Sequence, residues 1–138
     1  MSGLAHDLHV LVRALDRAAE GRLAPFGITY PRYLALVIVD DHPGLTQREL
    51  ATALGQSEAT ASRTTAGLVR EGHLEAERTP GAGNRRGLRL TAAGGDLVAR
   101  AGDALGTSFD EVVRDIGRDP QAWATDVRRL STILEESP

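Results

Sequence analysis

The chain has 138 residues, of which 41% are hydrophobic and 25% are charged, and a formal net charge of -3. This length suits a single domain, and the longest apolar run, 33–39, is far shorter than the roughly 20 residues that a membrane span needs. The sequence contains no cysteine, which excludes a disulfide framework and thiol redox sensing. No secretory signal is visible, so a cytoplasmic location is the simplest expectation.

The charge is unevenly distributed along the chain. Residues 46–91 hold seven arginines and five glutamates, a balance of +2, whereas the rest holds nine arginines and 14 acidic residues, a balance of -5. From Arg78 through Gly95 there are four arginines and no acidic residue. This concentrated positive charge favours a polyanionic partner even though the whole chain is acidic.

Two amphipathic helices are predicted in the N-terminal third. The first covers residues 4–23, because apolar side chains recur there at helical spacing: Leu4, Leu8, Leu11, Leu15 and Ala19. The second starts after Thr29, which can cap it, and ends at the sequence DDHPG, residues 40–44. Its expected buried stripe consists of Tyr30, Leu34, Val37 and Ile38.

The clearest helix start in the sequence comes at Thr46. Thr46 and Glu49 have the spacing of a capping box, in which each side chain accepts a hydrogen bond from the other residue's backbone N–H. This short helix ends at Gly55, and Ser57 caps a second helix over residues 57–71. Two helices joined by so tight a connection predict a helix-turn-helix.

A β-hairpin is predicted after the helix-turn-helix, because the apolar period changes there from 3.6 to about 2. Leu74 and Ala76 alternate with glutamates, and Leu88 and Leu90 flank Arg89 beyond the glycine-rich stretch 79–85. The spacing therefore predicts two short strands around a tip that carries arginines.

Two further helices are predicted in the last third of the chain. Thr91 caps a long helix whose apolar stripe consists of Leu97, Ala101, Leu105, Val112 and Ile116. Asp119 followed by Pro120 starts the last helix, because proline suits the first helical position. Its expected buried residues are Trp123, Val127, Leu130 and Leu134.

The sequence offers no set of residues for catalysis or metal binding. It contains no nucleophile motif, no phosphate-binding loop and no carboxylate pair that stands out. His6 and His9 have the i, i+3 spacing of a possible ligand pair, but without cysteines or an HExxH-like motif they are interpreted as surface residues. We expect neither an enzyme nor a metal site, and no cofactor.

These elements together predict a mainly α, winged helix-turn-helix fold with a two-stranded β wing and flanking helices at both ends. The stretch HPGLTQRELATALGQSEATASRTTAGLVREGHLE, followed by RRGLRLTAAG, resembles the MarR family of bacterial transcriptional regulators. The order and spacing of elements agree over about residues 4–136. The resemblance implies one domain, 1–138, with a DNA-binding lobe at about 29–92 and dimerisation helices at about 4–24 and 92–136.

The resemblance also implies a function for the chain. It implies a homodimer on a palindromic operator in double-stranded DNA, with one recognition helix in each major groove and each wing near a minor groove. A repressor is expected rather than an activator. Family members often bind small aromatic or anionic effectors that release DNA, and Tyr30, Tyr33 and Trp123 are the candidates to line such a pocket, although the same positions suit a hydrophobic core.

The expected recognition helix, 57–71, separates into two faces. The inward face consists of Ala61, Thr64, Thr65 and Leu68, and the outward face of Ala59, Ser62, Arg63, Ala66 and Arg70. Small side chains and an arginine suit contact with base edges, so Thr60, Ser62 and Arg63 are the candidate DNA contacts. Arg70 is either a phosphate contact or a partner of the helix C-terminus. Gly67, inside this helix, is expected to weaken its packing.

The wing supplies the other candidate DNA contacts. Arginine suits a narrow minor groove, where the potential is most negative, so Arg85 and Arg86 are assigned there or to phosphates. Arg78 and Arg89, nearer the strand ends, are assigned to the DNA backbone. The family usually has an aspartate two residues before its wing arginine; the sequence Asn84-Arg85-Arg86 departs from this, so either arginine can be the equivalent one.

A second hypothesis comes from a different class of protein. A winged-helix protein-interaction module or antirepressor without DNA binding would explain the net acidity and the softened recognition helix. The acid-free arginine wing argues against it, because concentrated positive charge favours a polyanionic partner, although such arginines can also form a merely solvated hairpin tip.

Overall fold

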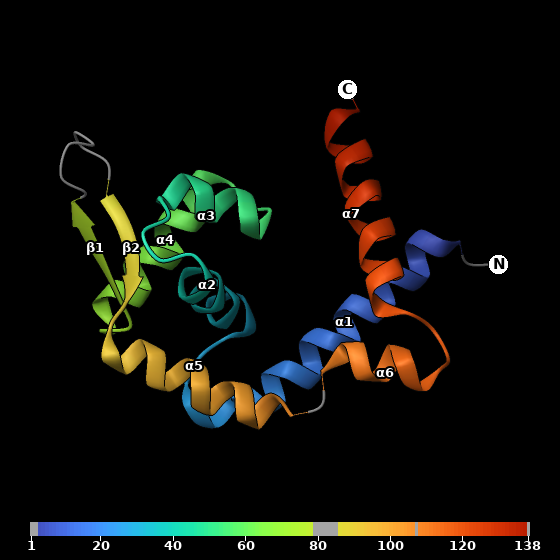
Figure 1. The fold of residues 1–138 in the computed structure, drawn as a ribbon, viewed down its shortest axis with the longest axis horizontal. Helices are drawn as coiled ribbons and strands as arrows, with labels where there is room; N and C mark the ends of the chain where they lie inside the picture. Colours follow the sequence, from blue (N-terminus) through green and yellow to red (C-terminus); the bar gives the residue numbers. More distant parts are fainter. Residues whose placement is uncertain (1–2, 79–85, 107, 138) are drawn as a thin grey trace. The chain divides into compact units, whose positions relative to one another are not determined.

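The computed structural model describes residues 3–78, 86–106 and 108–137, and the chain divides into two compact units, Met1–Leu105 and Gly106–Pro138 (Figure 1). The first unit contains α1 (Leu4–Leu23), the short 3-10 helix η1 (Ala24–Phe26), α2 (Tyr30–Asp41), α3 (Gln47–Leu54), α4 (Glu58–Arg70), β1 (Leu74–Arg78), β2 (Arg86–Leu90) and α5 (Ala92–Leu105). The second unit contains α6 (Phe109–Asp115) and α7 (Pro120–Glu136). The predicted fold class, mainly α with a two-stranded wing, is confirmed.

Side-chain caps fix the helix starts where the sequence predicted them. At α3 the Thr46 hydroxyl accepts a bond from the Glu49 N–H at 3.1 Å, and Glu49 Oε1 accepts one from the Thr46 N–H at 3.0 Å. The Ser57 hydroxyl caps α4 in the same way, and Asp119 Oδ1 caps α7. Each cap satisfies an N–H that has no partner inside its helix, so these short local patterns determine where the helices begin.

The first unit has a continuous hydrophobic core. Its six largest fully buried side chains come from five different elements: Leu23, Leu36, Val39, Leu50, Leu68 and Leu74. On α2 the most deeply buried residues are Ala35, Leu36 and Val39, whereas the predicted stripe of Tyr30, Leu34, Val37 and Ile38 is only half-buried. That prediction was wrong because α2 packs against α1, α3, α4, α5 and β2, so neighbours enclose several of its faces.

The hairpin is antiparallel and is attached to the segment that precedes α3. Its register pairs Leu74 with Leu90 and Arg78 with Arg86. The Gly44 N–H donates to the Leu88 carbonyl and the Leu88 N–H to the Leu45 carbonyl, both at 2.8 Å. These bonds extend the ladder by one short segment and fix the base of the wing against the helix-turn-helix (Figure 1).

The predicted long helix after Thr91 is wrong in its length. The start is correct, because the Thr91 hydroxyl accepts a bond from the Gly94 N–H at 3.0 Å. However, α5 ends at Leu105, where Gly106 has a left-handed backbone with φ of 67°, and the Ser108 hydroxyl caps the separate helix α6. A glycine in this conformation ends a helix, so Val112 belongs to α6 instead and Ile116 is the C-cap residue of α6.

The second unit buries little of its apolar surface within a single chain. The predicted buried residues of α7 are all exposed there, from 41% for Trp123 to 74% for Leu134. Of the described residues in this unit, only Val113 and Pro120 are buried. Two helices alone cannot enclose a core of their own. Helical periodicity therefore predicted buried residues on α7 that are exposed in a single chain.

Candidate nucleic-acid interface

The helix-turn-helix is built from α3, α4 and a three-residue turn. Gly55 has φ of 64°, which lets its N–H bond back to the carbonyls of Ala51 and Thr52. The Gln56 N–H also donates to the Ala51 carbonyl, at 2.9 Å. These bonds close the end of α3 and direct the chain immediately into α4, so the turn has the tight geometry that the sequence predicted.

The outward face of α4 is as the periodicity predicted. Ala59, Ser62, Arg63, Ala66 and Arg70 are all exposed. On the inward face Ala61, Thr65 and Leu68 are buried and Thr64 is half-buried. The exposed surface is narrow and smooth along its middle, because its central side chains are alanines and a serine.

Thr60 holds Arg63 in place. The Thr60 hydroxyl oxygen accepts bonds from the Ser57 hydroxyl at 3.0 Å and from Arg63 Nη2 at 3.3 Å. Thr60 itself is only half exposed. Of the predicted contacts on α4, Thr60 therefore orients the guanidinium, while Ser62 and Arg63 present their own polar atoms to solvent.

Arg70 and Glu71 do not form a pair of their own. Glu71 Oε1 accepts a bond from Arg32 Nη1 at 2.6 Å, and Glu71 Oε2 lies 3.7 Å from Nδ1 of His73. Arg70 is exposed at the end of α4 and has no ion pair with any residue that the structure describes. Its charge is therefore available to a ligand or to the helix C-terminus.

Sequence analysis did not identify Arg32, which crosses the buried side of α4. A Cβ atom added at Gly67 would lie 2.7 Å from Arg32 Nη2, so the glycine leaves room for the guanidinium on its way to Glu71. Gly67 is therefore a packing site for a long side chain. The glycine inside a helix was the signal, because such a residue often marks a close approach.

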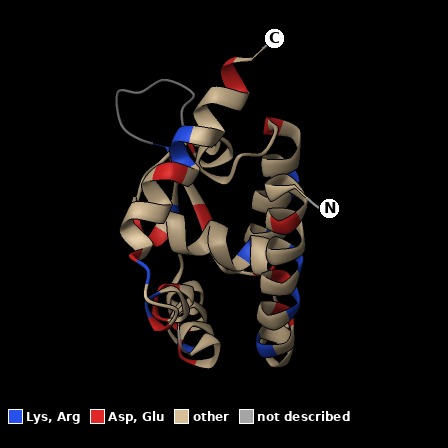
Figure 2. Cartoon of the chain, turned by 90° about the vertical axis from the view of Figure 1, so that its right-hand side faces the viewer, with Lys and Arg blue, Asp and Glu red and all other residues tan. Residues whose placement is uncertain are grey.

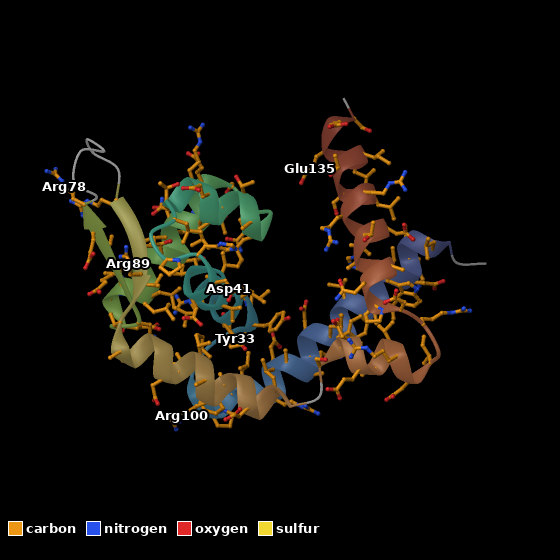
Figure 3. All side chains as sticks on the ribbon, viewed as in Figure 1. Tyr33, Asp41, Arg78, Arg89, Arg100 and Glu135 are labelled. Atoms are coloured by element: carbon orange, nitrogen blue, oxygen red, sulfur yellow. The ribbon has the colours of Figure 1, made fainter. Side chains whose placement is uncertain are left out.

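The wing arginines differ in how they are held. Arg78 and Arg86 face each other across the last pair of the ladder, and both are exposed. Figure 3 shows the Arg78 side chain pointing away from the hairpin. Arg89 Nε lies 3.5 Å from Glu77 Oε2, so that arginine is partly neutralised. Arg85 lies outside the described residues.

The three aromatic candidates for an effector site fall in both units. The rings of Tyr30 and Tyr33 lie 6.3 Å apart on α2, and burial, with a smaller contribution from Tyr30, raises the pKa of Tyr33. Trp123 is exposed on α7. A hollow of about 360 Å³ in the first unit is lined by other residues, among them Phe26 and Arg100.

Charged residues of both signs are interspersed along the helices (Figure 2).

Within the described parts of the chain, no group of three or more His, Asp or Glu side chains is arranged to hold a metal ion. No helix in those parts is long and apolar enough to cross a membrane.

Comparison with known proteins identifies the family. The MarR family profile matches residues 26–86. The transcriptional regulator HosA of Escherichia coli O111:H- is 32% identical to this chain over 105 residues, which cover 75% of this chain and 77% of HosA. The chain belongs to the MarR family. It is therefore related to transcriptional regulators, as its sequence motifs had indicated.

Solved structures agree with this MarR-family assignment. The transcriptional regulator PcaV from Streptomyces coelicolor, in complex with its natural ligand, is 27% identical and superimposes with a TM-score of 0.73 over 99% of each chain. A mutant MarR from E. coli complexed with operator DNA is 21% identical, with a TM-score of 0.77 over 95% of this chain and 93% of that one. The second likeness concerns the fold alone.

Proposed function

We propose that this MarR-family regulator binds DNA as a homodimer and acts as a repressor at an inverted-repeat operator. The outward face of α4 is the observation that carries the proposal. Ala59, Ser62 and Ala66 form a smooth strip of small side chains that leaves the helix slim enough for a major groove. Arg63 lies at one edge of this strip.

The exposed side chains on α4 are assigned to different parts of the DNA. The alanines can approach thymine methyl groups, and Ser62 can donate to or accept from a base edge. Arg63, oriented by Thr60, reaches base edges or phosphates. Arg70 contributes a phosphate contact, since no described residue neutralises it.

The wing adds a second set of contacts to the same half-site. Arg85 and Arg86 enter or border the minor groove, where arginine is favoured by the strongly negative potential. Arg78 points away from the hairpin (Figure 3), and we assign it to a phosphate contact. Arg89 contacts the DNA backbone only by leaving Glu77, so its contribution is the smallest.

Dimerisation explains the apolar surface that a single chain leaves exposed. In the first unit Leu4, Leu8, Val10 and Val12 are exposed on α1, and in the second Val112, Ile116, Val127, Leu130, Ile133 and Leu134 are exposed on α6 and α7. Large exposed apolar surfaces mark interaction sites, and a two-fold interface would cover them. We assign residues 4–24 and 92–136 to dimerisation and 29–92 to DNA binding.

An effector is part of the same proposal. PcaV binds its natural ligand and shares 27% of its sequence with this chain. Tyr30 and Tyr33 in the first unit and Trp123 in the second are our candidate contacts for a small aromatic or anionic compound. Such a compound would release DNA by binding one arrangement of the dimer better than the other. The protein acts in the cytoplasm and catalyses no reaction.

Selection of bound duplexes from a random DNA pool, followed by fluorescence anisotropy across a salt series, tests the proposal. We expect an inverted repeat with half-sites about one helical turn, roughly 34 Å, apart. If no sequence is enriched and binding vanishes at moderate salt, the hypothesis of a protein-interaction module replaces this one.

Arg85→Ala tests the wing directly. It should lower affinity and reduce the slope of log K against log salt concentration by about one counterion. Arg100→Ala is the matched control, because this exposed arginine lies on α5 over the Phe26 ring, 5.6 Å from its centroid, and should leave the slope unchanged. An unchanged slope for Arg85→Ala as well would remove the wing contact from the proposal.

A further inference from the structure

One ion pair connects the two helices of the helix-turn-helix at the surface. Arg48 Nε on α3 lies 2.9 Å from Glu58 Oε1 in the first turn of α4, and the side chains are 85% and 64% exposed. Neither takes part in another ion pair with a described residue. So exposed a pair adds little to stability, typically less than about 1 kcal/mol.

Glu58 lies in the first turn of α4, where the helix dipole favours an acid, but DNA would not. It lies on the helix that enters the major groove under the proposed function, where an unscreened carboxylate would be repelled by the phosphates of DNA. Arg48 neutralises it across the turn. With this pair in place, the Glu58 carboxylate, which can only accept hydrogen bonds, can approach the bases.

Glu58 and Arg63 border the smooth strip of α4 on opposite sides. They are five residues apart, which at about 100° per residue places them about 140° apart around the helix. Ala59, Ser62 and Ala66 lie between them and are exposed. The strip thus has a hydrogen-bond donor at one edge and an acceptor at the other, so its two edges favour different bases.

We propose that Glu58 is a specificity-determining residue that accepts a hydrogen bond from the N4 amine of a cytosine, with Arg48 as its positioning residue. Among the major-groove edges, cytosine offers a donor and no adjacent acceptor, which suits a carboxylate. Arg48, whose Nε lies 2.9 Å from Glu58 Oε1, holds this carboxylate in place and offsets its charge. This inference rests on the proposed function.

The test repeats the duplex selection with the full-length protein and four variants. Glu58→Ala should lose its preference for a C·G pair at one position in each half-site, by about fivefold or more. Glu58→Gln should shift that position towards adenine, which an amide can contact through both donor and acceptor. A purely structural role would not exchange one preferred base for another.

Arg48→Ala separates positioning from contact. It leaves the carboxylate unscreened, so affinity should fall for all sequences and the salt slope should become shallower by about one. Asp96→Ala is the matched control, because Asp96 forms an exposed ion pair with Arg100 on α5, with side chains 65% and 66% exposed. It should leave both the selected motif and the salt slope as in the wild type.

Each outcome assigns the failure to one of the two proposals. If the wild type enriches an inverted repeat and Glu58→Ala enriches the same repeat with unchanged preferences at every position, the role of Glu58 is wrong while DNA binding stands. If the wild type enriches nothing, the proposed function fails and this inference fails with it.

Discussion

The two units of the chain bury their apolar side chains to very different extents. In the first, Leu36, Leu50 and Leu68 are fully buried and belong to one core. In the second, Leu130 is 47% exposed and Leu134 is 74% exposed. The first unit therefore has a core of its own, although α1 also exposes apolar side chains, whereas the second unit leaves most of its apolar side chains exposed.

This difference separates two structural tasks. The contacts that orient the recognition helix, such as the caps and the ion pair between Arg32 and Glu71, all lie within one chain. The contacts that would set the distance between two recognition helices do not. Changes in the second unit should therefore affect assembly, whereas changes in the core of the first unit should affect folding and changes on α4 or the wing should affect DNA recognition.

The largest effect should come from placing a charge on the exposed apolar surface of α7. Leu130 is 47% exposed in one chain, so Leu130→Asp both removes apolar area that a dimer would bury and places a charge there, and a two-fold interface counts the change twice. We expect the dissociation constant of the dimer to rise by about 100-fold or more. Sedimentation velocity over a range of protein concentrations measures it.

A matched variant on the same helix distinguishes this effect from a general loss of helix stability. Gln121→Glu also adds a negative charge to α7, but in its first turn, where the helix dipole favours an acid. Its dimer should be as stable as the wild type. A Leu130→Asp protein with the wild-type dissociation constant would show that α7 takes no part in dimerisation.

A smaller effect is expected where the first unit is most tightly packed. A Cβ atom at Gly94 would lie 2.1 Å from the carbonyl oxygen of His73, so Gly94→Ala forces α5 away from the start of the wing. Such overpacking costs about 1–3 kcal/mol. Urea denaturation at one fixed protein concentration should show this loss in the free energy of unfolding.

Gly95 is the internal control for this variant. It is the next residue on the same helix, but a Cβ atom there meets nothing within 4 Å. Gly95→Ala should therefore raise stability by up to about 1 kcal/mol through helix propensity. Equal losses for both variants would mean that the close contact with His73 is not the cause.

Local signals made most of the fold predictable. Thr46 with Glu49, Ser57, and Asp119 with Pro120 gave correct helix starts, because a cap is decided within four residues of sequence. The break after Leu105 was missed since Val112 continues the apolar spacing across it. Ser108 and Glu111 have capping-box spacing and were the available signal.

The candidate site was predictable only in part. Helical periodicity separates the two faces of α4, so the exposure of Ser62 and Arg63 could be derived from spacing. The roles of Arg32 and Arg48 could not. Their partners, Glu71 and Glu58, are set by how separate helices pack, and no local pattern of sequence encodes that contact.

The smallest change in the free energy of unfolding is expected for a substitution at Gly67, the second tightly packed glycine of the first unit. Unlike Gly94, it faces the end of a flexible side chain, since a Cβ atom there would lie 2.7 Å from Arg32 Nη2. Gly67→Ala gains about 1 kcal/mol of helix propensity and loses a similar amount when Arg32 leaves Glu71. The free energy of unfolding should therefore change by less than about 0.5 kcal/mol.

A double-mutant cycle makes that near-zero change informative. In an Arg32→Ala background the three atoms nearest to the new methyl group are gone, so adding Gly67→Ala should stabilise the protein by about 1 kcal/mol. Thermal or urea unfolding of the four proteins gives the coupling between the two positions. If Gly67→Ala destabilises both backgrounds equally, Arg32 is not what the glycine accommodates, and the helix itself must require a residue without a side chain at that position.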